Sequence, residues 1–354
     1  MKKINVAVLS EGSLTHLLMH LSFIGQLKKI ISISYDVCFS LISEYGNEVN
    51  REIIEFSGIV DNVIEKKELN NNDYDLVIGI KYLPEIIHIN KSKLNGLNEI
   101  LKKILYQWKS LQNSEGTAKF FSKNKWYDSN IVVWTLLNER NFFNVADITG
   151  DLAMSKTGFS FILKDSALKE SVLKKYNLNE CKFITVRIDE CNSSNSDDSV
   201  GIWPTSYWNI LIQKIRSEYP EYKIVQIGNR NVNVLDTVDM NISGMTSLKE
   251  VKVLLASAIL HLDTESDYVH LRNVLKGGVS IVLWGQLPEQ FFSHTDNINI
   301  VKQTECPHWC MELSDYWVEK CMYKKNSNVC MKSIMPEEVV DSVKKILKKN
   351  SELL

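Results

Sequence analysis

The chain has 354 residues, a length that predicts two domains, each large enough to bury its own apolar core. Its residues are 44% hydrophobic and 24% charged, as in ordinary globular proteins, and the formal net charge is only −2. This balance supplies no basic field for nucleic acid, which argues against a general DNA-binding role.

The N-terminal residues carry no recognisable targeting signal. Met1, Lys2 and Lys3 lead into a short apolar run, residues 4–9, that lacks the long apolar core and cleavage site of a signal peptide. No segment approaches the ~20 unbroken apolar residues of a membrane-spanning helix. We therefore expect a cytoplasmic protein with at most peripheral membrane contact, whose thiols stay reduced.

The first half of the chain alternates short β-rich runs with helical patterns. Strands are predicted at residues 4–10, 36–42, 60–64 and 74–80, and helices at 48–56, 97–111 and 131–145. Between the first two strands, Ser13 is placed to cap a helix with an apolar stripe of Leu14, Leu17, Leu18, Leu21 and Ile24. This order predicts a parallel sheet covered by helices.

The pattern restarts near residues 150–165, which predicts domains at 1–160 and 161–354. Strands are expected at 183–188, 222–228, 259–262 and 279–284, and a polar run at 192–199 predicts a loop. Thr205 or Ser206 would cap one helix, and Ser247 with Glu250 forms a capping box for another. The terminal helix, 337–349, carries the stripe Val339, Val340, Val343 and Leu347 and a basic end of Lys344, Lys345, Lys348 and Lys349.

One polar segment follows the predicted strand 259–262 and precedes a helix. It contains Glu265, Ser266, Asp267 and His270. Ligands of open α/β sheets bind at the carboxyl ends of strands, and a helix N-terminus favours phosphate. Ser266 and His270 share a helix face and could reach the same phosphate. On this spacing alone, however, an ordinary capped helix with a half-buried histidine is the better interpretation.

The wider sequence strengthens the functional interpretation. Five features follow one another along the chain: the turn Trp203-Pro204, the stretch 241–258, the element 265–271, the strand 279–284 ending at Gly285, and the tail 330–339. Together they resemble family 9 glycosyltransferases, the ADP-heptose:lipopolysaccharide heptosyltransferases, whose matching element reads Asp-Ser/Thr-Gly-x-x-His-Leu. The resemblance covers roughly residues 180–345 and is weak over the first half.

This resemblance implies the α/β GT-B architecture, with two Rossmann-like domains whose parallel sheets face a central cleft. It implies that the C-terminal domain binds a nucleotide-diphosphate sugar and the N-terminal domain a glycan, lipid-linked or protein acceptor. Transfer would be inverting and metal-independent, with no cofactor required. The donor-binding candidates are Trp203, Gly228, Glu265, Ser266, Asp267 and His270.

The chain departs from the family pattern at the contact positions. The family's first loop reads Gly-Asp, and its aspartate is the proposed base, whereas this chain has Gly12-Ser13. Glu11 is the local replacement, and His16 matches a histidine of the same family loop, so Glu11, Ser13 and His16 are the acceptor-side catalytic candidates. The family's phosphate-binding lysine aligns with Gly201.

Two further groups of residues have a spacing that suggests metal binding. His16 and His20 have metal-pair spacing, but without an evident third ligand they are better interpreted as core or surface histidines. Four cysteines in the segment 306–330, namely Cys306, Cys310, Cys321 and Cys330, could hold structural zinc or iron. Their spacing lacks a tight Cys-x-x-Cys pair, so free buried thiols are the competing interpretation. The aromatic residues of this segment, Trp309, Tyr316 and Trp317, are expected in a core or interface.

Three functions therefore remain open. The first is a glycosyltransferase acting on a lipopolysaccharide, polysaccharide or protein. The second is a catalytically impaired relative that binds nucleotide or glycan or serves as a partner subunit, which the changes at Ser13 and Gly201 motivate. The third is a sugar-nucleotide epimerase, which can share the same two-domain architecture.

Overall fold

The computed structural model describes residues 1–43, 48–90, 92, 98–114, 127–160, 165–189, 199–302, 306–318, 320–323 and 328–352. The chain divides into two compact units, Met1–Phe159 and Ser160–Leu354. Most of the polar run predicted as a loop, residues 192–198, lies outside the described residues.

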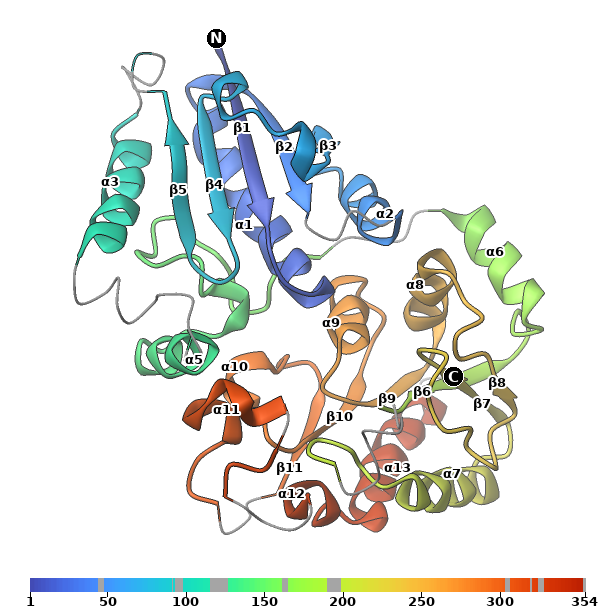
Figure 1. The fold of residues 1–354 in the computed structure, drawn as a ribbon. Helices are drawn as coiled ribbons and strands as arrows, with labels where there is room; N and C mark the ends of the chain where they lie inside the picture. The colour runs from blue at the N-terminus through green and yellow to red at the C-terminus, as the bar shows by residue number, and fades with distance from the viewer. Residues whose placement is uncertain are drawn as a thin grey trace. The chain divides into compact units, whose positions relative to one another are not determined.

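The N-terminal unit is built on a five-stranded sheet (Figure 1). Its strands are β1 (Lys2–Ser10), β2 (Tyr35–Ser43), β3 (Asn62–Ile64), β4 (Leu76–Ile80) and β5 (Pro84–Ile89). They lie in the order β3-β2-β1-β4-β5, with β5 antiparallel to β4 and the other pairs parallel. The helices are α1 (Leu14–Ser32), α2 (Glu48–Ser57), α3 (Glu99–Asn113) and α5 (Tyr127–Leu137), with short 3-10 turns η1 (Lys66–Glu68), η2 (Asn71–Asp73) and η3 (Phe142–Asn144).

Local sequence explains most of these elements. Ser13 is the N-cap of α1, and the predicted residues Leu17, Leu18, Leu21 and Ile24 are buried in it. The helix predicted over 131–145 is wrong in extent, because α5 stops at Leu137 and Glu139 takes the left-handed conformation that ends a helix. The edge strand β5 was not predicted from the sequence.

The C-terminal unit has a six-stranded parallel sheet (Figure 1). Its strands are β6 (Lys182–Arg187), β7 (Tyr222–Ile227), β8 (Met240–Asn241), β9 (Leu260–Thr264), β10 (Ser280–Trp284) and β11 (Ile298–Val301), in the order β11-β10-β9-β6-β7-β8. The helices are α6 (Ser166–Lys175), α7 (Thr205–Glu218), α8 (Leu248–Ser257), α9 (Asp267–Val274), α10 (Glu289–Phe292), α11 (Cys310–Leu313), α12 (Val329–Lys332) and α13 (Pro336–Glu352), with the turn η4 (Asp315–Val318).

Helices cover both faces of this sheet, with α7 packed on α13, and α8 packed on α6 and α9 (Figure 1). The predicted stripe of α13 joins the core of the unit. The predicted capping box of α8 is present, since Ser247 accepts from the backbone of Glu250 and the Glu250 carboxylate accepts from Ser247. The predicted cap of α7 is wrong: the N-cap position is Pro204, and Thr205 is already helical.

Both sheets share one topological feature that decides where ligands bind. From β6 the chain moves outward to β7 and β8, then returns to the other side of β6 with β9, β10 and β11. The first unit repeats this order around β1, with β4 on its other side. In such sheets the crevice outside the carboxyl ends of the two central strands is the usual ligand site. Among the described residues, no helix is both long enough and apolar enough to cross a membrane.

Candidate functional site

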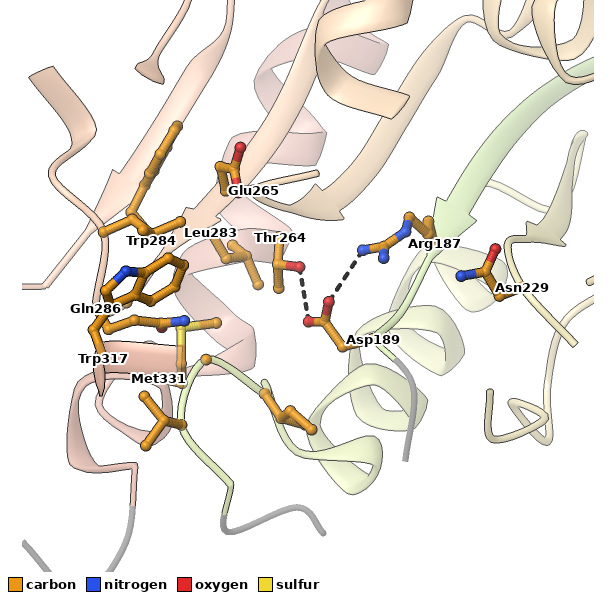
Figure 2. A pocket seen from close by; sticks show the side chains of 15 residues that line it. Arg187, Asp189, Asn229, Thr264, Glu265, Leu283, Trp284, Gln286, Trp317 and Met331 are labelled. Atoms are coloured by element: carbon orange, nitrogen blue, oxygen red, sulfur yellow. Dashed lines mark hydrogen bonds and ion pairs between the residues drawn. The ribbon is translucent and has the colours of Figure 1, made fainter. Parts of the chain in front are cut away.

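The principal pocket lies where the switch in strand order predicts a ligand site. Residues that line it come from the carboxyl ends of β6, β7, β9 and β10, and its volume is about 330 Å³. Figure 2 shows the polar residues Arg187, Asp189 and Asn229 on one side and Gln286, Trp317 and Met331 on the other. The pocket therefore belongs entirely to the C-terminal unit.

A buried ion-pair network forms its polar side. Arg187 Nη1 donates to Asp189 Oδ1 at 3.1 Å and to Asp263 Oδ1 at 3.2 Å, and Thr264 Oγ1 donates to Asp189 Oδ2 at 2.8 Å. Burial opposes the charge of Arg187, but the two aspartates outweigh it and raise the guanidinium pKa. Burial also raises the pKa of Asp189 against the lowering effect of Arg187. Arg187 and Asp189 were not singled out from the sequence, although their position at the end of a predicted strand was a usable signal.

The same network continues into the core beneath the pocket. Asp263 Oδ2 accepts from Ser266 Oγ at 2.5 Å and lies 3.1 Å from His261 Nε2, while His261 Nδ1 contacts Thr185 Oγ1 at 2.9 Å. Asp263, His261 and Thr185 are fully buried. Burial lowers the pKa of His261, so a neutral imidazole links the two side chains. These contacts hold the loop after β9 at a fixed place.

Of the residues predicted to bind phosphate, some lie on the pocket wall and others lie in the core. Glu265 lines the pocket, whereas Ser266 caps α9 and His270 is only 1% exposed. His270 Nε2 lies 3.0 Å from Glu265 Oε1, and His270 Nδ1 lies 2.9 Å from His294 Nε2. Burial holds the pKa of His294 well below its usual value.

The two ring nitrogens of His270 have different partners. Nε2 faces the carboxylate of Glu265, and Nδ1 faces the ring of His294. His270 therefore lies behind Glu265 and orients its carboxylate. Asp267 occupies the first helical position of α9, where its charge matches the helix dipole.

Gly201 lines the pocket with a positive φ of 85°. A Cβ at this position would lie 2.4 Å from Nε2 of Gln286, which also lines the pocket. Gln286 thus occupies the space that a longer residue at 201 would need. The positive φ favours glycine at this position, because a residue with a Cβ is strained there, and a longer side chain would also require Gln286 to move.

The remaining predicted donor residues lie beside the pocket. Trp203 is 1% exposed, packs against Trp208 and donates its indole N–H to Ile334 at 2.9 Å, so it belongs to the core. Gly228 follows β7 with φ 138°, next to Asn229 of the pocket wall. Trp317, expected in a core or interface, lines the pocket instead.

The four predicted cysteines gather around a second cavity. Cys306, Cys310, Cys321 and Cys330 all line a space of about 190 Å³ that shares Val200, Gly285 and Gln286 with the principal pocket. Burial raises the pKa of Cys310 to about 11 and also raises that of Cys330, so both are neutral thiols at neutral pH. In the described ranges, no three His, Cys, Asp or Glu side chains are arranged to hold a metal ion.

The N-terminal unit carries a second polar site at the ends of β1 and β4. The Glu11 N–H donates to Ile80, and the Ser13 N–H donates to Nδ1 of His16 at 3.2 Å. Gly12 has φ 108°, and a Cβ there would lie 2.4 Å from the His16 ring. The predicted acceptor-side residues Glu11, Ser13 and His16 are therefore brought together in one tight turn.

His20 fixes the two strand ends beneath this turn. It is fully buried, with Nδ1 2.7 Å from Ser10 Oγ and Nε2 2.8 Å from the carbonyl oxygen of Lys81. Burial lowers its pKa to about 4, so the ring is neutral at neutral pH. The metal-pair spacing of His16 and His20 thus has a structural explanation, as the sequence suggested.

Beside this turn, Lys81 pairs with Asp128 at 2.7 Å and lies over the rings of Tyr82 and Tyr127. Burial raises the pKa of Tyr127, and the negative charges of Asp128 and Glu11 add to that shift. The site therefore contains the carboxylate of Glu11 and the ammonium group of Lys81, which is already paired with Asp128.

No protein-family model matches the chain, and no curated protein matches it by sequence. Solved structures do match it along nearly its whole length. Heptosyltransferase II of E. coli, an ADP-heptose lipopolysaccharide enzyme, aligns at TM-score 0.58 and 12% identity, covering 99% of this chain and 100% of its own. A family 9 glycosyl transferase of Veillonella parvula aligns at 0.56 and 14%, covering 98% and 97%.

TibC of enterotoxigenic E. coli, an iron-containing dodecameric glycosyltransferase, aligns at TM-score 0.60 and 11% identity, covering 98% of this chain and 77% of its own. Its complex with ADP-D-β-D-heptose aligns at 0.57 and 10%, covering 99% and 78%. At such identities the similarity is one of fold. The chain has the GT-B fold of family 9 heptosyltransferases, which confirms the predicted fold class and the resemblance at that level.

Proposed function

We propose that this protein is a glycosyltransferase that moves a sugar from a nucleotide-diphosphate donor, held by the C-terminal unit, to an acceptor. The acceptor would be a lipopolysaccharide, another polysaccharide or a protein, and transfer would be inverting and metal-independent. One observation carries the proposal: a polar pocket lies at the strand-order switch of the C-terminal sheet, in a chain with the heptosyltransferase fold. The TibC complex with ADP-D-β-D-heptose supports this class of donor.

The site residues receive distinct roles in this proposal. Glu265 contacts the donor from the pocket wall, while Ser266 and His270 hold its loop and Gly228 permits close approach of the backbone. In the N-terminal unit, Glu11 deprotonates the acceptor hydroxyl, and His16 and Ser13 shape its turn. A positioned base of this kind contributes about 10²–10⁴-fold to rate.

The first experiment tests donor binding and turnover together. The purified protein is mixed with ADP-, GDP-, UDP- and dTDP-sugars in a thermal-shift screen, since a bound ligand stabilises the fold by mass action. Release of the nucleoside diphosphate is then measured with candidate acceptors. Binding of one donor, with acceptor-dependent release, is the expected result, and an altered sugar nucleotide without acceptor would indicate the epimerase instead.

A second function is favoured by two specific positions. Ser13 lacks a carboxylate where the resemblance expects the base, and Gly201 lacks a side chain where it expects a lysine. A catalytically impaired relative would bind the donor in the thermal-shift screen and release no nucleotide with any acceptor. Turnover abolished by Glu11→Gln would exclude this candidate.

We also propose a structural metal ion, zinc or iron, at the four cysteines around the second cavity. Their convergence and the iron in TibC support it, although the thiols as placed form no metal-binding group among the described residues. Elemental analysis of protein purified without chelators should give about one metal per chain, because structural sites of this kind hold metal tightly. Cys310→Ser should lose it, Cys181→Ser should keep it, and metal-free wild-type protein would end the proposal.

A lipid-linked acceptor would place the protein at the inner face of a membrane. The basic end of α13 supplies modest positive charge, but Lys344 is already paired with Glu218 at 2.8 Å. Weak, salt-sensitive binding to anionic vesicles is therefore expected at most. A cytoplasmic protein with a soluble protein acceptor would show none.

A further inference from the structure

Two buried histidines lie in line behind the wall of the principal pocket. His270 belongs to α9 and is 1% exposed, and His294, which is 3% exposed, lies in the segment between α10 and β11. Nδ1 of His270 is 2.9 Å from Nε2 of His294, and Nε2 of His270 is 3.0 Å from Oε1 of Glu265. A continuous line of polar contacts therefore connects the segment after α10 with a residue that lines the pocket.

The two contacts of His270 support each other. A polar group buried away from water is costly unless it is hydrogen-bonded, and both ring nitrogens of His270 have a partner. Rotation of the ring about its Cβ–Cγ bond would break both contacts, so His294 fixes the plane from which Nε2 meets the carboxylate. Burial holds the pKa of His294 well below its usual value, so at neutral pH this ring acts through hydrogen bonding and not through charge.

His294 is itself fixed to the sheet. Its carbonyl oxygen accepts from the backbone N–H of Asn297 at 3.1 Å and from Nδ2 of Asn299, a residue of β11, at 3.3 Å. Oδ1 of Asn299 accepts from the indole N–H of Trp284 at 2.9 Å, and Trp284 is the last residue of β10. The backbone that carries His294 is therefore held by two strands of the sheet, and its ring is a fixed point behind the pocket.

The third member of the line belongs to the pocket. Glu265 lines it beside Thr264, and the Glu265 side chain is 20% exposed (Figure 2). Its Oε1 is engaged with His270, which leaves Oε2 to accept a hydrogen bond from a hydroxyl group of a bound ligand. A glutamate side chain that rotates freely loses that freedom on binding, whereas one that is already held has lost it on folding. A carboxylate fixed in advance therefore binds a hydroxyl more tightly.

We propose that His294 is a positioning residue, which acts through His270 to hold the Glu265 carboxylate in the orientation that binds a hydroxyl group of the donor. The inference rests on the proposed function, in which Glu265 contacts the donor, and it adds a residue that the resemblance does not supply. Neither histidine is among the described residues that line the pocket, so His294 affects the donor only through Glu265. A residue that only stabilises the fold would affect binding whether or not Glu265 is present.

Two substitutions and their combination test this dependence in the full-length protein. Donor affinity is measured by calorimetry with whichever of the ADP-, GDP-, UDP- and dTDP-sugars binds the wild-type protein most tightly. His294→Leu, which keeps a similar side-chain volume but removes the polar atoms, should weaken binding by roughly 5- to 20-fold. In the Glu265→Ala background the same change should alter affinity by less than about 2-fold, because the group that His294 positions is gone.

Two further variants separate positioning from packing. His294→Gln places an amide near the position of Nε2 and should recover most of the affinity. Phe291→Leu is the matched control, because Phe291 is fully buried in α10 and does not line the pocket. It should lower the free energy of unfolding in urea and leave donor affinity unchanged. If His294→Leu does not fold, His294→Asn, whose side chain ends short of Nε2, takes its place.

Equal losses in the wild-type and Glu265→Ala backgrounds would overturn this inference and leave the proposed function intact. Full affinity of His294→Leu, or a loss in Phe291→Leu as large as in His294→Leu, would have the same consequence. No binding of any of the four kinds of sugar nucleotide to the wild-type protein would overturn the proposed function and this inference with it.

Discussion

The two units share one topology and use it differently. Each sheet places its first and fourth strands side by side, so each has a polar site at the carboxyl ends of that pair: β1 with β4, and β6 with β9. In the N-terminal unit the site is a single tight turn after β1, with Glu11 and His16 within six residues. In the C-terminal unit it is a pocket whose walls come from four strand ends and a distant segment.

This difference fits the two roles in the proposed function. A tight turn with one carboxylate would position a single proton acceptor, whereas a pocket with an ion-pair network and an apolar wall would recognise a larger molecule. The supporting cores also differ. His20 and the Glu11–Ile80 backbone hydrogen bond tie the two strand ends of the N-terminal site, while the C-terminal site rests on a continuous chain of Arg187, Asp263, His261 and Thr185.

The largest expected effect is at the N-terminal site and tests the catalytic half of this comparison. Glu11→Gln keeps the shape of the turn but removes the proposed base, so kcat should fall by about 10²–10⁴-fold while donor affinity is unchanged. Glu99→Gln is a matched control, because its carboxylate is 89% exposed at the start of α3. Steady-state kinetics with the identified donor measure both. Full activity of Glu11→Gln would remove Glu11 from the chemistry and direct attention to His16.

A second change tests how strongly the C-terminal framework depends on one buried cation. Arg272 donates to the carbonyl oxygens of Leu255, Ala258 and Val279, joining the end of α8 to the start of β10. Burial lowers its pKa to about 9. Arg272→Met leaves these carbonyls without their donor, so the free energy of unfolding should fall by about 3–4 kcal/mol.

Urea denaturation of Arg272→Met and Arg272→Lys measures that loss. Lysine restores part of the charge but reaches fewer carbonyls, so it should recover only part of the stability. A matched substitution at Arg216, which lies on the surface of α7 and is paired with Asp239, should cost far less. Equal losses at Arg272 and Arg216 would contradict the role assigned to Arg272.

The N-terminal site should be sensitive to pH through His20. Its pKa is about 4 in the folded protein and 6.5 in the unfolded chain, so the unfolded chain binds the proton more tightly. The contribution of His20 to the free energy of unfolding is therefore fully present above pH 6.5. It is lost as the pH falls, and the loss reaches about 3 kcal/mol below pH 4. Denaturation of wild type and His20→Asn between about pH 7.5 and about pH 5 should show a smaller decline in the variant. His261 and His294, whose pKa values are also lowered by burial, supply the decline that remains.

The sequence was most informative where structure is decided locally. The caps at Ser13 and Ser247 and the stripe of α13 involve residues within one or two turns, and the structure confirms them. The helix predicted over 131–145 was wrong because its apolar residues continue past Leu137 into η3, where they are buried without being helical. A hydrophobic pattern records burial and does not by itself distinguish a helix from a packed turn.

The candidate site was predictable only in part, for a similar reason. Glu265 could be found because it lies three residues after the predicted strand 259–262, in the segment that leads into a helix. Trp317 lies 53 residues further along the chain than Thr264 and reaches the pocket through packing that no local pattern records. His270 has the spacing of a phosphate ligand, but its two ring nitrogens face Glu265 and His294, and those contacts depend on the tertiary structure.

Gly201 offers the smallest of these effects and the sharpest test of the C-terminal pocket. Gly201→Lys restores the residue that the resemblance expects, so an argument from sequence predicts tighter donor binding. The structure predicts the opposite: the positive φ and the contact with Gln286 should cost about 1–3 kcal/mol of stability and displace Gln286 into the pocket. Gly201→Lys combined with Gln286→Ala should recover part of this loss, because the second change removes the clash and leaves only the backbone strain. Calorimetry of the single and double variants measures donor affinity, and thermal unfolding measures their stability. Tighter donor binding in the single variant would contradict this prediction. It would show that the Gln286 side chain moves aside at little cost and that the pocket accommodates a lysine at position 201.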